Sequence, residues 1–137
     1  MEEILVDSDI FIALTNHGDA SHKAVSELLP KLKSRFSFLT TNFVFAETLT
    51  LISRRFGLSL SLKVAEIIEA TAVILDINTE TRLNAFGIFK KQTSKNVSFT
   101  DCVNLAVSQN LGQEKIFSFD EHYAKNGLKR PGFEAKV

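Results

Sequence analysis

The sequence predicts an α/β fold, in which a mainly parallel sheet carries helices on both faces. Short apolar runs such as residues 4–6 and 36–39 are typical of buried strands, and segments with helical spacing of apolar residues separate them. Parallel neighbours need crossover connections of this length, and these are usually helices. We expect residues 1–137 to form one domain, since a chain of this length buries roughly two-thirds of its unfolded surface.

Strands and helices are expected to alternate through the first half of the chain. They are a strand over 4–6, a helical turn over 9–14, a helix over 20–32 and a strand over 36–39. Polar residues 16–21 are typical of a loop. Thr41 or Asn42 can cap the next helix, which runs to about Arg55 and stops at Gly57.

The second half continues the alternation. It is expected to contain a helix over 58–69, a strand over 73–77, a helix from 79 to about 90, a helix from 98 or 100 to 112, a strand over 115–119 and a short fifth strand over 133–137. In the helix from 79 to about 90, successive turns carry Leu83, Phe86 and Phe89. Gly112 fits the C-terminal stop of the helix that begins at 98 or 100.

Composition and missing motifs exclude several classes of protein. The formal net charge is zero, so the chain lacks the basic character of a protein that holds nucleic acid by charge alone. The single Cys102 excludes an internal disulfide and a cysteine-based zinc site, and the three histidines lack zinc spacing. No serine-hydrolase elbow, Walker loop or dinucleotide fingerprint is present. No signal peptide or long apolar segment is visible, so we expect a cytoplasmic protein without a membrane partner.

Carboxylates stand at positions where an α/β fold gathers functional groups. Asp7 and Asp120 each end a short apolar run, and Glu47 and Asp101 lie near the starts of helical patterns. Strand C-termini and helix N-termini meet along one edge of a parallel sheet, where ligands bind. Acids that converge there repel each other unless a cation lies between them. A hard divalent cation with oxygen ligands is the natural occupant, and metal-assisted phosphate chemistry is the leading prediction.

Two of these acids also have structural interpretations. Asp7 can be the polar end of a strand, with Ser8 or Asp9 capping the next helix, although Asp9 can itself reach the same edge. Glu47 shares a helical stripe with apolar side chains, where a carboxylate is costly unless it is paired or binds a metal. The alternative for Glu47 is a side chain at the edge of that stripe that turns outward.

The other two acids can be helix caps. Ser98, followed three residues later by Asp101, fits the capping box in outline, and the helix macrodipole favours an acid in the first turn. Asp120 can be the N-cap of a short turn over 121–124. Each acid alone is therefore weak evidence for a metal site, and the combination is stronger.

The combined pattern resembles the PIN domain, specifically its VapC-like toxin group, over nearly the whole chain. The resemblance is carried by the segments ILVDSDIFIAL at 4–14, TNFVFAE at 41–47, SFTDC at 98–102 and SFDEHY at 118–123. By this resemblance the metal-binding acids are Asp7, Glu47, Asp101 and Asp120. Ser8, Asp9 and Ser98 match supporting polar positions of the family.

The resemblance implies a fold and an activity. The fold is a three-layer α/β/α arrangement around a five-stranded parallel sheet of order 3-2-1-4-5. The activity is hydrolysis of RNA phosphodiester bonds by a Mg²⁺- or Mn²⁺-dependent endoribonuclease, with Asp7 and Asp101 as direct ligands and Glu47 and Asp120 acting directly or through water. A homodimer is also implied, and so is a cognate antitoxin if the protein is a toxin.

Three alternatives remain open at this point. The chain can be a PIN nuclease that acts in RNA processing without an antitoxin. It can be a non-catalytic binding module whose acids are caps and surface charges. A phosphatase of the haloacid dehalogenase type is also conceivable because Asp7 and Asp9 follow a strand, but Ile10 and Phe11 stand where that family has Thr or Gly.

Overall fold

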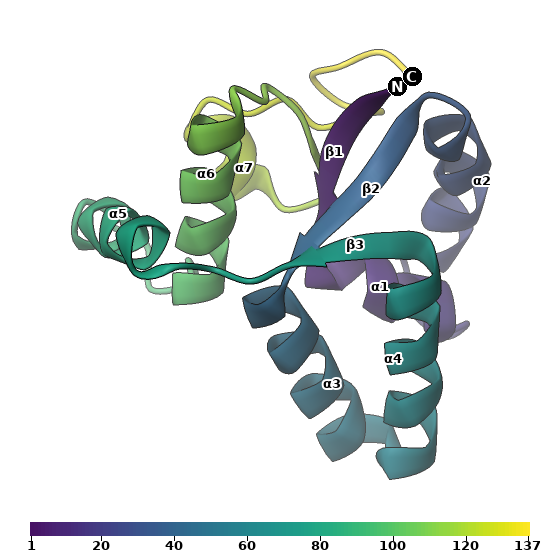
Figure 1. Ribbon diagram of the computed structural model, residues 1–137. Helices are drawn as coiled ribbons and strands as arrows, with labels where there is room; N and C mark the ends of the chain where they lie inside the picture. Colours follow the sequence, from purple (N-terminus) through teal and green to yellow (C-terminus); the bar gives the residue numbers. More distant parts are fainter.

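A computed structural model describes all 137 residues and contains a four-stranded parallel sheet between layers of helices (Figure 1). The strands are β1 (Glu2–Val6), β2 (Phe36–Thr41), β3 (Ala72–Leu75) and β4 (Ile116–Phe117), in the order β3-β2-β1-β4. Leu5 of β1 lies beside Leu39 on one side and Ile116 on the other. The α/β class and the order of the first four strands are confirmed.

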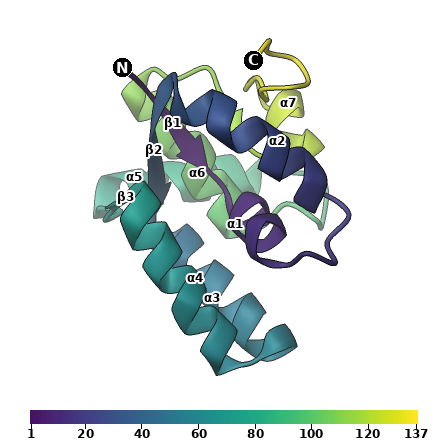
Figure 2. The same ribbon diagram turned by 90° about the vertical axis from the view of Figure 1, so that its right-hand side faces the viewer.

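Seven helices connect and cover these strands. They are α1 (Ser8–Thr15), α2 (His22–Lys33), α3 (Asn42–Phe56), α4 (Leu58–Thr71), α5 (Thr79–Lys90), α6 (Phe99–Leu111) and α7 (Glu121–Lys125). Helices α3 and α4 form a hairpin that extends beyond the end of the sheet (Figures 1 and 2). No helix combines the length and the apolar character needed to cross a lipid bilayer.

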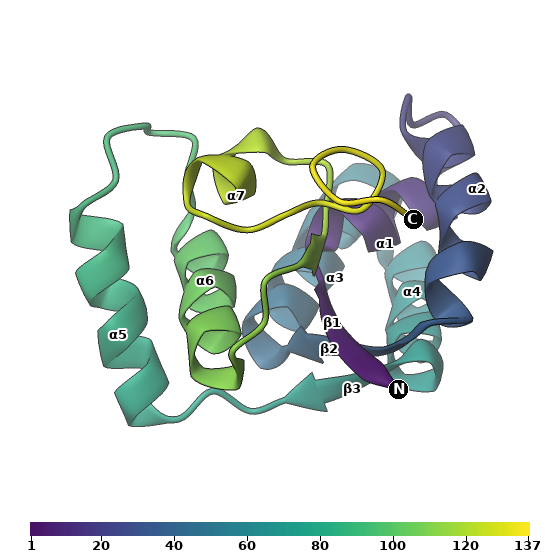
Figure 3. The same ribbon diagram turned by 90° about the horizontal axis from the view of Figure 1, so that it is seen from above.

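The sheet separates two hydrophobic cores. Ile4 and Val6 point to a core shared with α1 to α4, whereas Leu5 points to a core shared with α5, α6 and α7. Side chains alternate along a strand in this way, so a short apolar run serves both faces. Figure 3 shows the two helical layers on opposite sides of the sheet. The predicted three-layer arrangement is therefore confirmed.

Capping residues set the bounds of α3 largely as predicted. The Thr41 hydroxyl accepts a hydrogen bond from Val44 N–H at 3.1 Å, which satisfies one unpaired donor of the first turn. Gly57 ends the helix with a φ of 98°, a conformation that favours glycine.

The predicted fifth strand over 133–137 is wrong. Only one parallel bridge, Lys115 with Lys129, extends the sheet beyond β4. The ladder stops there because Pro131 has no N–H to donate, and the chain then turns back so that Gly132 N–H donates to Ala135 O at 2.9 Å. Segment 128–131 thus occupies the edge beside β4 without forming a regular strand.

Strand β4 is also shorter than the predicted 115–119. The backbone N–H of Phe119 donates to the carboxylate of Asp9 at 2.8 Å instead of to a neighbouring strand. The chain leaves the sheet at this point and enters the loop that carries Asp120.

Candidate metal centre

The predicted acids lie at the carboxyl edge of the sheet, each on a different element. Asp7 follows β1, and its Oδ1 accepts a hydrogen bond from Ser8 N–H at 2.7 Å, so Asp7 itself is the N-cap of α1. Glu47 lies on α3, Asp101 in the first turn of α6, and Asp120 is the N-cap of α7. Strands β1 and β4 are neighbours where the strand order reverses, which brings Asp7 and Asp120 to the place where α/β proteins bind ligands.

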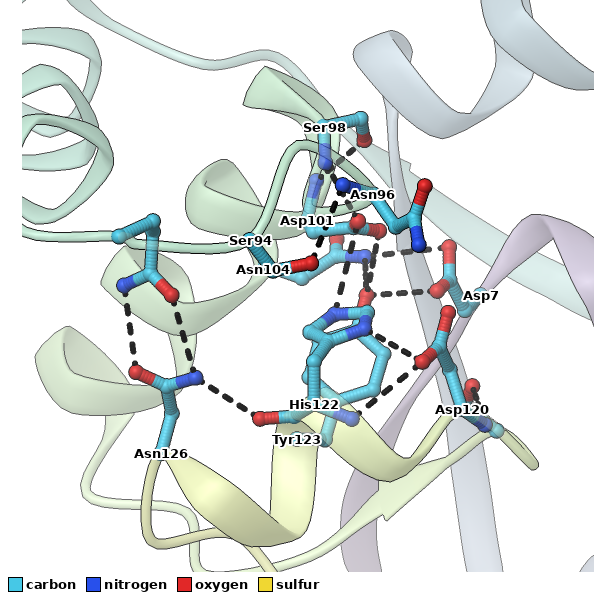
Figure 4. A network of polar contacts seen from close by, with 12 residues as sticks. Asp7, Ser94, Asn96, Ser98, Asp101, Asn104, Asp120, His122, Tyr123 and Asn126 are labelled. Atoms are coloured by element: carbon cyan, nitrogen blue, oxygen red, sulfur yellow. Dashed lines mark hydrogen bonds and ion pairs between the residues drawn. The ribbon is translucent and has the colours of Figure 1, made fainter.

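Tyr123 joins Asp7 to Asp101. Its hydroxyl oxygen lies 2.6 Å from Asp7 Oδ2 and 3.3 Å from Asp101 Oδ1 (Figure 4). Asn104 donates to the same hydroxyl oxygen at 2.8 Å and to Asp7 Oδ1 at 3.3 Å. All four side chains are buried, and no lysine or arginine pairs with either acid. Because a hydroxyl has only one proton to donate, the phenol cannot fully satisfy both carboxylates.

His122 joins Asp101 to Asp120. Its Nδ1 lies 2.6 Å from Asp120 Oδ1, and its Nε2 lies 3.6 Å from Asp101 Oδ2. The ring is buried against Tyr123, with ring centroids 4.0 Å apart. Figure 4 shows the three acids Asp7, Asp101 and Asp120 around His122 and Tyr123.

Asp9 holds the loop that carries Asp120. Its Oδ2 accepts hydrogen bonds from Phe119 N–H at 2.8 Å and from the Ser118 hydroxyl at 3.1 Å. The Ser118 oxygen in turn accepts from Asp120 N–H at 3.1 Å. The predicted supporting residue Asp9 is therefore connected to Asp120 through two hydrogen bonds.

Glu47 lies at one side of the group. The Ser8 hydroxyl donates to Glu47 Oε2 at 3.2 Å, which connects α3 to the end of β1. Partial burial, followed by the negative charge of Asp101, raises the pKa of Glu47 despite this hydrogen bond. The charge of Asp101 therefore acts on Glu47, and the one side-chain hydrogen bond of Glu47 is the bond from Ser8.

The capping roles considered for these acids coexist with the acidic cluster. Ser98 and Asp101 form both bonds of a capping box, with Ser98 N–H donating to Asp101 Oδ2 at 2.8 Å and Asp101 N–H donating to Ser98 Oγ at 3.1 Å. The second oxygen of Asp101 faces Tyr123. Asp7 likewise uses Oδ1 as a cap and turns Oδ2 to Tyr123. Each cap fixes its carboxylate and leaves one oxygen directed to the centre.

Burial and mutual repulsion make the cluster a site for positive charge. Burial, and then the charges of Asp9 and Asp101, raise the pKa of Asp7 to about 8. Burial is also the main reason that the pKa of Asp9 is raised. A divalent cation favours ionised ligands and removes this repulsion.

His122 and Asp120 shift each other in opposite directions. The hydrogen bond from His122 lowers the pKa of Asp120. Burial opposes protonation of the imidazole, but the hydrogen bond to Asp120 and the charges of Asp101, Asp120 and Asp7 outweigh it and raise the pKa of His122.

The donor set fits a divalent cation. One ligand atom from each of Asp101, Asp120 and His122 lies within 4.8 Å of the others. Carboxylate oxygens suit Mg²⁺ and Mn²⁺, and imidazole suits the transition metals. Asp7 is linked to the same group through Tyr123.

Sequence reasoning missed the contributions of Asn104, His122 and Tyr123. Asn104 stands three residues after Asp101, so both lie on one face of α6. His122 and Tyr123 follow Asp120 by two and three residues, on the first turn of α7. These spacings are visible in the sequence, but the bonds to Asp7 depend on how β1, α6 and α7 pack together.

The fold and the gathered carboxylates define an α/β protein with an acidic cluster, suited to a cation, at the reversal point of a parallel sheet. The chain belongs to the PIN domain family, whose model matches residues 4–128. It is 28% identical over 126 residues to the 23S rRNA-specific endonuclease VapC20 of Mycobacterium tuberculosis, a match that covers 91% of this chain and 95% of that protein. The predicted resemblance is confirmed.

Solved structures of toxin and toxin–antitoxin proteins share the fold. The crystal structure of Mycobacterium tuberculosis VapC20, a sarcin-ricin loop cleaving toxin, superimposes with a TM-score of 0.84 at 25% identity, covering 94% of this chain and 98% of that one. VapBC2 from Rickettsia felis, bound to a promoter DNA fragment, gives a TM-score of 0.69 at 12% identity, covering 93% and 96%. A toxin–antitoxin complex from Klebsiella pneumoniae gives 0.58 at 14% identity, covering 87% and 88%.

Proposed function

We propose that this protein is a metal-dependent endoribonuclease that hydrolyses RNA phosphodiester bonds, the toxin of a VapBC-type toxin–antitoxin pair. The observation that carries the proposal is the pair of buried acids Asp7 and Asp101, with the exposed Asp120 beside them at the carboxyl edge of the sheet and no lysine or arginine paired with any of the three. The similarity to a 23S rRNA-specific endonuclease along 91% of the chain supports RNA as the substrate.

The acids have distinct roles in this proposal. Asp7 and Asp101 hold the cation directly, because the caps fix both carboxylates at the centre. Asp101 Oδ1 faces Tyr123, and Oδ2, which accepts from Ser98 N–H, keeps a second lone pair on the side of His122. Glu47 and Asp120 complete the site directly or through water. A bound Mg²⁺ or Mn²⁺ supplies an acidified water and stabilises the charge that develops on the scissile phosphate.

The supporting residues fix the acids in place. Ser98 holds Asp101 through the capping box, and Ser8 links Glu47 to the end of β1. Asp9 holds the loop before Asp120. Carboxylates that are already fixed need little rearrangement when a cation and a phosphate bind. Electrostatic stabilisation of a transition state is most effective when the charged groups are preorganised in this way.

Ribosomal RNA is the first substrate to test. The similar VapC20 is named for 23S rRNA and, in its crystal structure, for cleavage of the sarcin-ricin loop. This chain is formally neutral, so it lacks a general electrostatic preference for RNA, and recognition of a particular RNA shape is consistent with that charge.

An antitoxin and a second copy of the chain are the proposed protein partners. Large apolar side chains are exposed on the α3–α4 hairpin and on α5, namely Leu51, Phe56, Leu58, Leu62, Leu83, Phe86 and Phe89. Exposed apolar surface of this kind is typical of protein interfaces. A toxin–antitoxin complex among the structures that share the fold supports an antitoxin as one occupant.

The activity is tested by incubating purified protein with ribosomes, with naked ribosomal RNA and with a mixed RNA pool, in Mg²⁺, Mn²⁺ or EDTA. Asp7→Asn and Asp101→Asn are assayed beside the wild type. We expect discrete cleavage that requires the metal and is lost in both variants. Cleavage that survives in both variants, or in EDTA, overturns the proposal.

A further inference from the structure

We propose that His122 is a ligand of the divalent cation through Nε2, with Asp120 orienting the ring from behind. The proposal rests on the proposed function, since it names a residue of the same cation site. It adds a nitrogen donor to a site whose predicted ligands are all carboxylates, and of the two roles proposed for Asp120 it selects the indirect one.

The orientation of the ring follows from its contacts. The Asp120 carboxylate can only accept, and it lies 2.6 Å from Nδ1, so Nδ1 carries a proton and donates to it. Nε2 is then the atom that faces Asp101. The ring is fixed further by its contact with Tyr123, with centroids 4.0 Å apart.

Nε2 is buried without a partner. The His122 side chain is 8% exposed, and Nε2 has no hydrogen bond within the protein. Its nearest charged neighbour, Asp101 Oδ2, is 3.6 Å away, beyond hydrogen-bonding distance. Leaving a buried polar atom without a partner costs free energy and is rare in folded proteins. A bound ion at Nε2 would supply the partner that this atom lacks within the protein.

The separation of the two donors suits one shared cation. Donor atoms about 2.1 Å from the same ion lie roughly 3.0 to 3.5 Å apart when they subtend 90° to 110° at the metal. The 3.6 Å between Nε2 and Asp101 Oδ2 is close to this range, so a small movement of either side chain suffices. A carboxylate behind the outer nitrogen of a histidine ligand is the usual arrangement in metalloproteins, because it fixes the tautomer and the ring orientation.

A nitrogen donor changes which metals the site prefers. Mg²⁺ favours an all-oxygen octahedron and keeps several waters, whereas imidazole suits the divalent transition metals. We therefore infer that His122 increases the preference of this site for Mn²⁺ over Mg²⁺. The competing role for His122 is that of an internal cation, in which a protonated ring lies between Asp101 and Asp120 and never touches a metal.

The test is electron spin-echo modulation of Mn²⁺ bound to the protein, which detects coupling to a directly bound imidazole ¹⁴N. The chain has three histidines, so the double variant His17→Asn/His22→Asn leaves His122 as the only imidazole. His122→Asn is the matched variant: its amide N–H can still donate to Asp120, but it has no atom at the position of Nε2.

We expect ¹⁴N coupling in the wild type and in the double variant, and no coupling in His122→Asn. The Mn²⁺ dissociation constant of His122→Asn should rise about tenfold or more, with a smaller rise for Mg²⁺. Mn²⁺ that binds the double variant without ¹⁴N coupling overturns the role of His122 and leaves the carboxylate site intact. Failure of Mn²⁺ to bind any form overturns the proposed metal-dependent function together with this inference.

Discussion

Replacing Asp7 with Asn should stabilise the metal-free protein, and the gain should grow with pH. Asp7 is 3% exposed, and burial together with the charges of Asp9 and Asp101 raises its pKa to about 8. The unfolded carboxyl group has a pKa of about 3.9, so between about pH 4 and pH 8 the folded protein retains a proton that the unfolded chain has lost. Stability is therefore lost as the pH rises through this window.

The size of the effect follows from the shift. A rise from 3.8 to about 8 corresponds to at most about 6 kcal/mol at a cost of about 1.4 kcal/mol for each pKa unit. An amide at position 7 is also polar and buried, so part of this gain is not realised. We expect Asp7→Asn to raise the free energy of unfolding by about 2 kcal/mol at pH 8 and by less at pH 5.

The assay is urea unfolding in EDTA at pH 5 and pH 8. Asp76→Asn, at an exposed position, serves as the matched control and should change neither value by much. Saturating Mn²⁺ should reverse the order of stability, because a cation that binds only the folded wild type stabilises it. The reasoning is refuted if Asp7→Asn is no more stable than the wild type in EDTA at pH 8, or if its gain is the same at both pH values.

Three further substitutions test the contacts around the acids. Tyr123→Phe removes the hydroxyl shared with Asp7, and urea unfolding should show a loss of about 1 to 3 kcal/mol. Asp9→Ala frees the loop before Asp120, and the RNA cleavage rate should fall at least tenfold; an unchanged rate would show that Asp9 does not position Asp120. Arg130→Ala removes a buried guanidinium that donates to Phe119 O at 2.7 Å, and thermal unfolding should show that the free energy of unfolding falls by about 2 to 4 kcal/mol. An unchanged free energy of unfolding would show that this contact does not stabilise the fold.

The α/β class and the place of the acids could be predicted because they depend on local patterns. Apolar runs such as Ile4–Val6 mark buried strands, and a polar residue such as Asp7 directly after the run marks the strand end. The parallel order then brings the strand ends together at one edge. The capping box of Ser98 and Asp101 was also predictable, since its signal spans only four residues.

Features that depend on distant contacts could not be predicted. The early end of β4 reflects the bond from Phe119 N–H to Asp9, residues 110 positions apart. The role of Tyr123 depends on Asp7, which is 116 positions away. Pro131 is visible in the sequence, but its effect on the edge of the sheet depends on the pairing of Lys129 with Lys115, which no local pattern indicates.

The central claim is that the acids at the carboxyl edge of the sheet hold a divalent cation for RNA cleavage, and the most direct test is calorimetric titration of metal-free protein with Mn²⁺. Wild-type protein and Asp101→Asn should be titrated at the same pH and ionic strength. Asp101 touches both Tyr123 and His122, so its loss breaks the centre of the network. We predict saturable Mn²⁺ binding in the wild type that is weakened at least tenfold in Asp101→Asn. Equal binding by both proteins, or none by the wild type, would contradict the account.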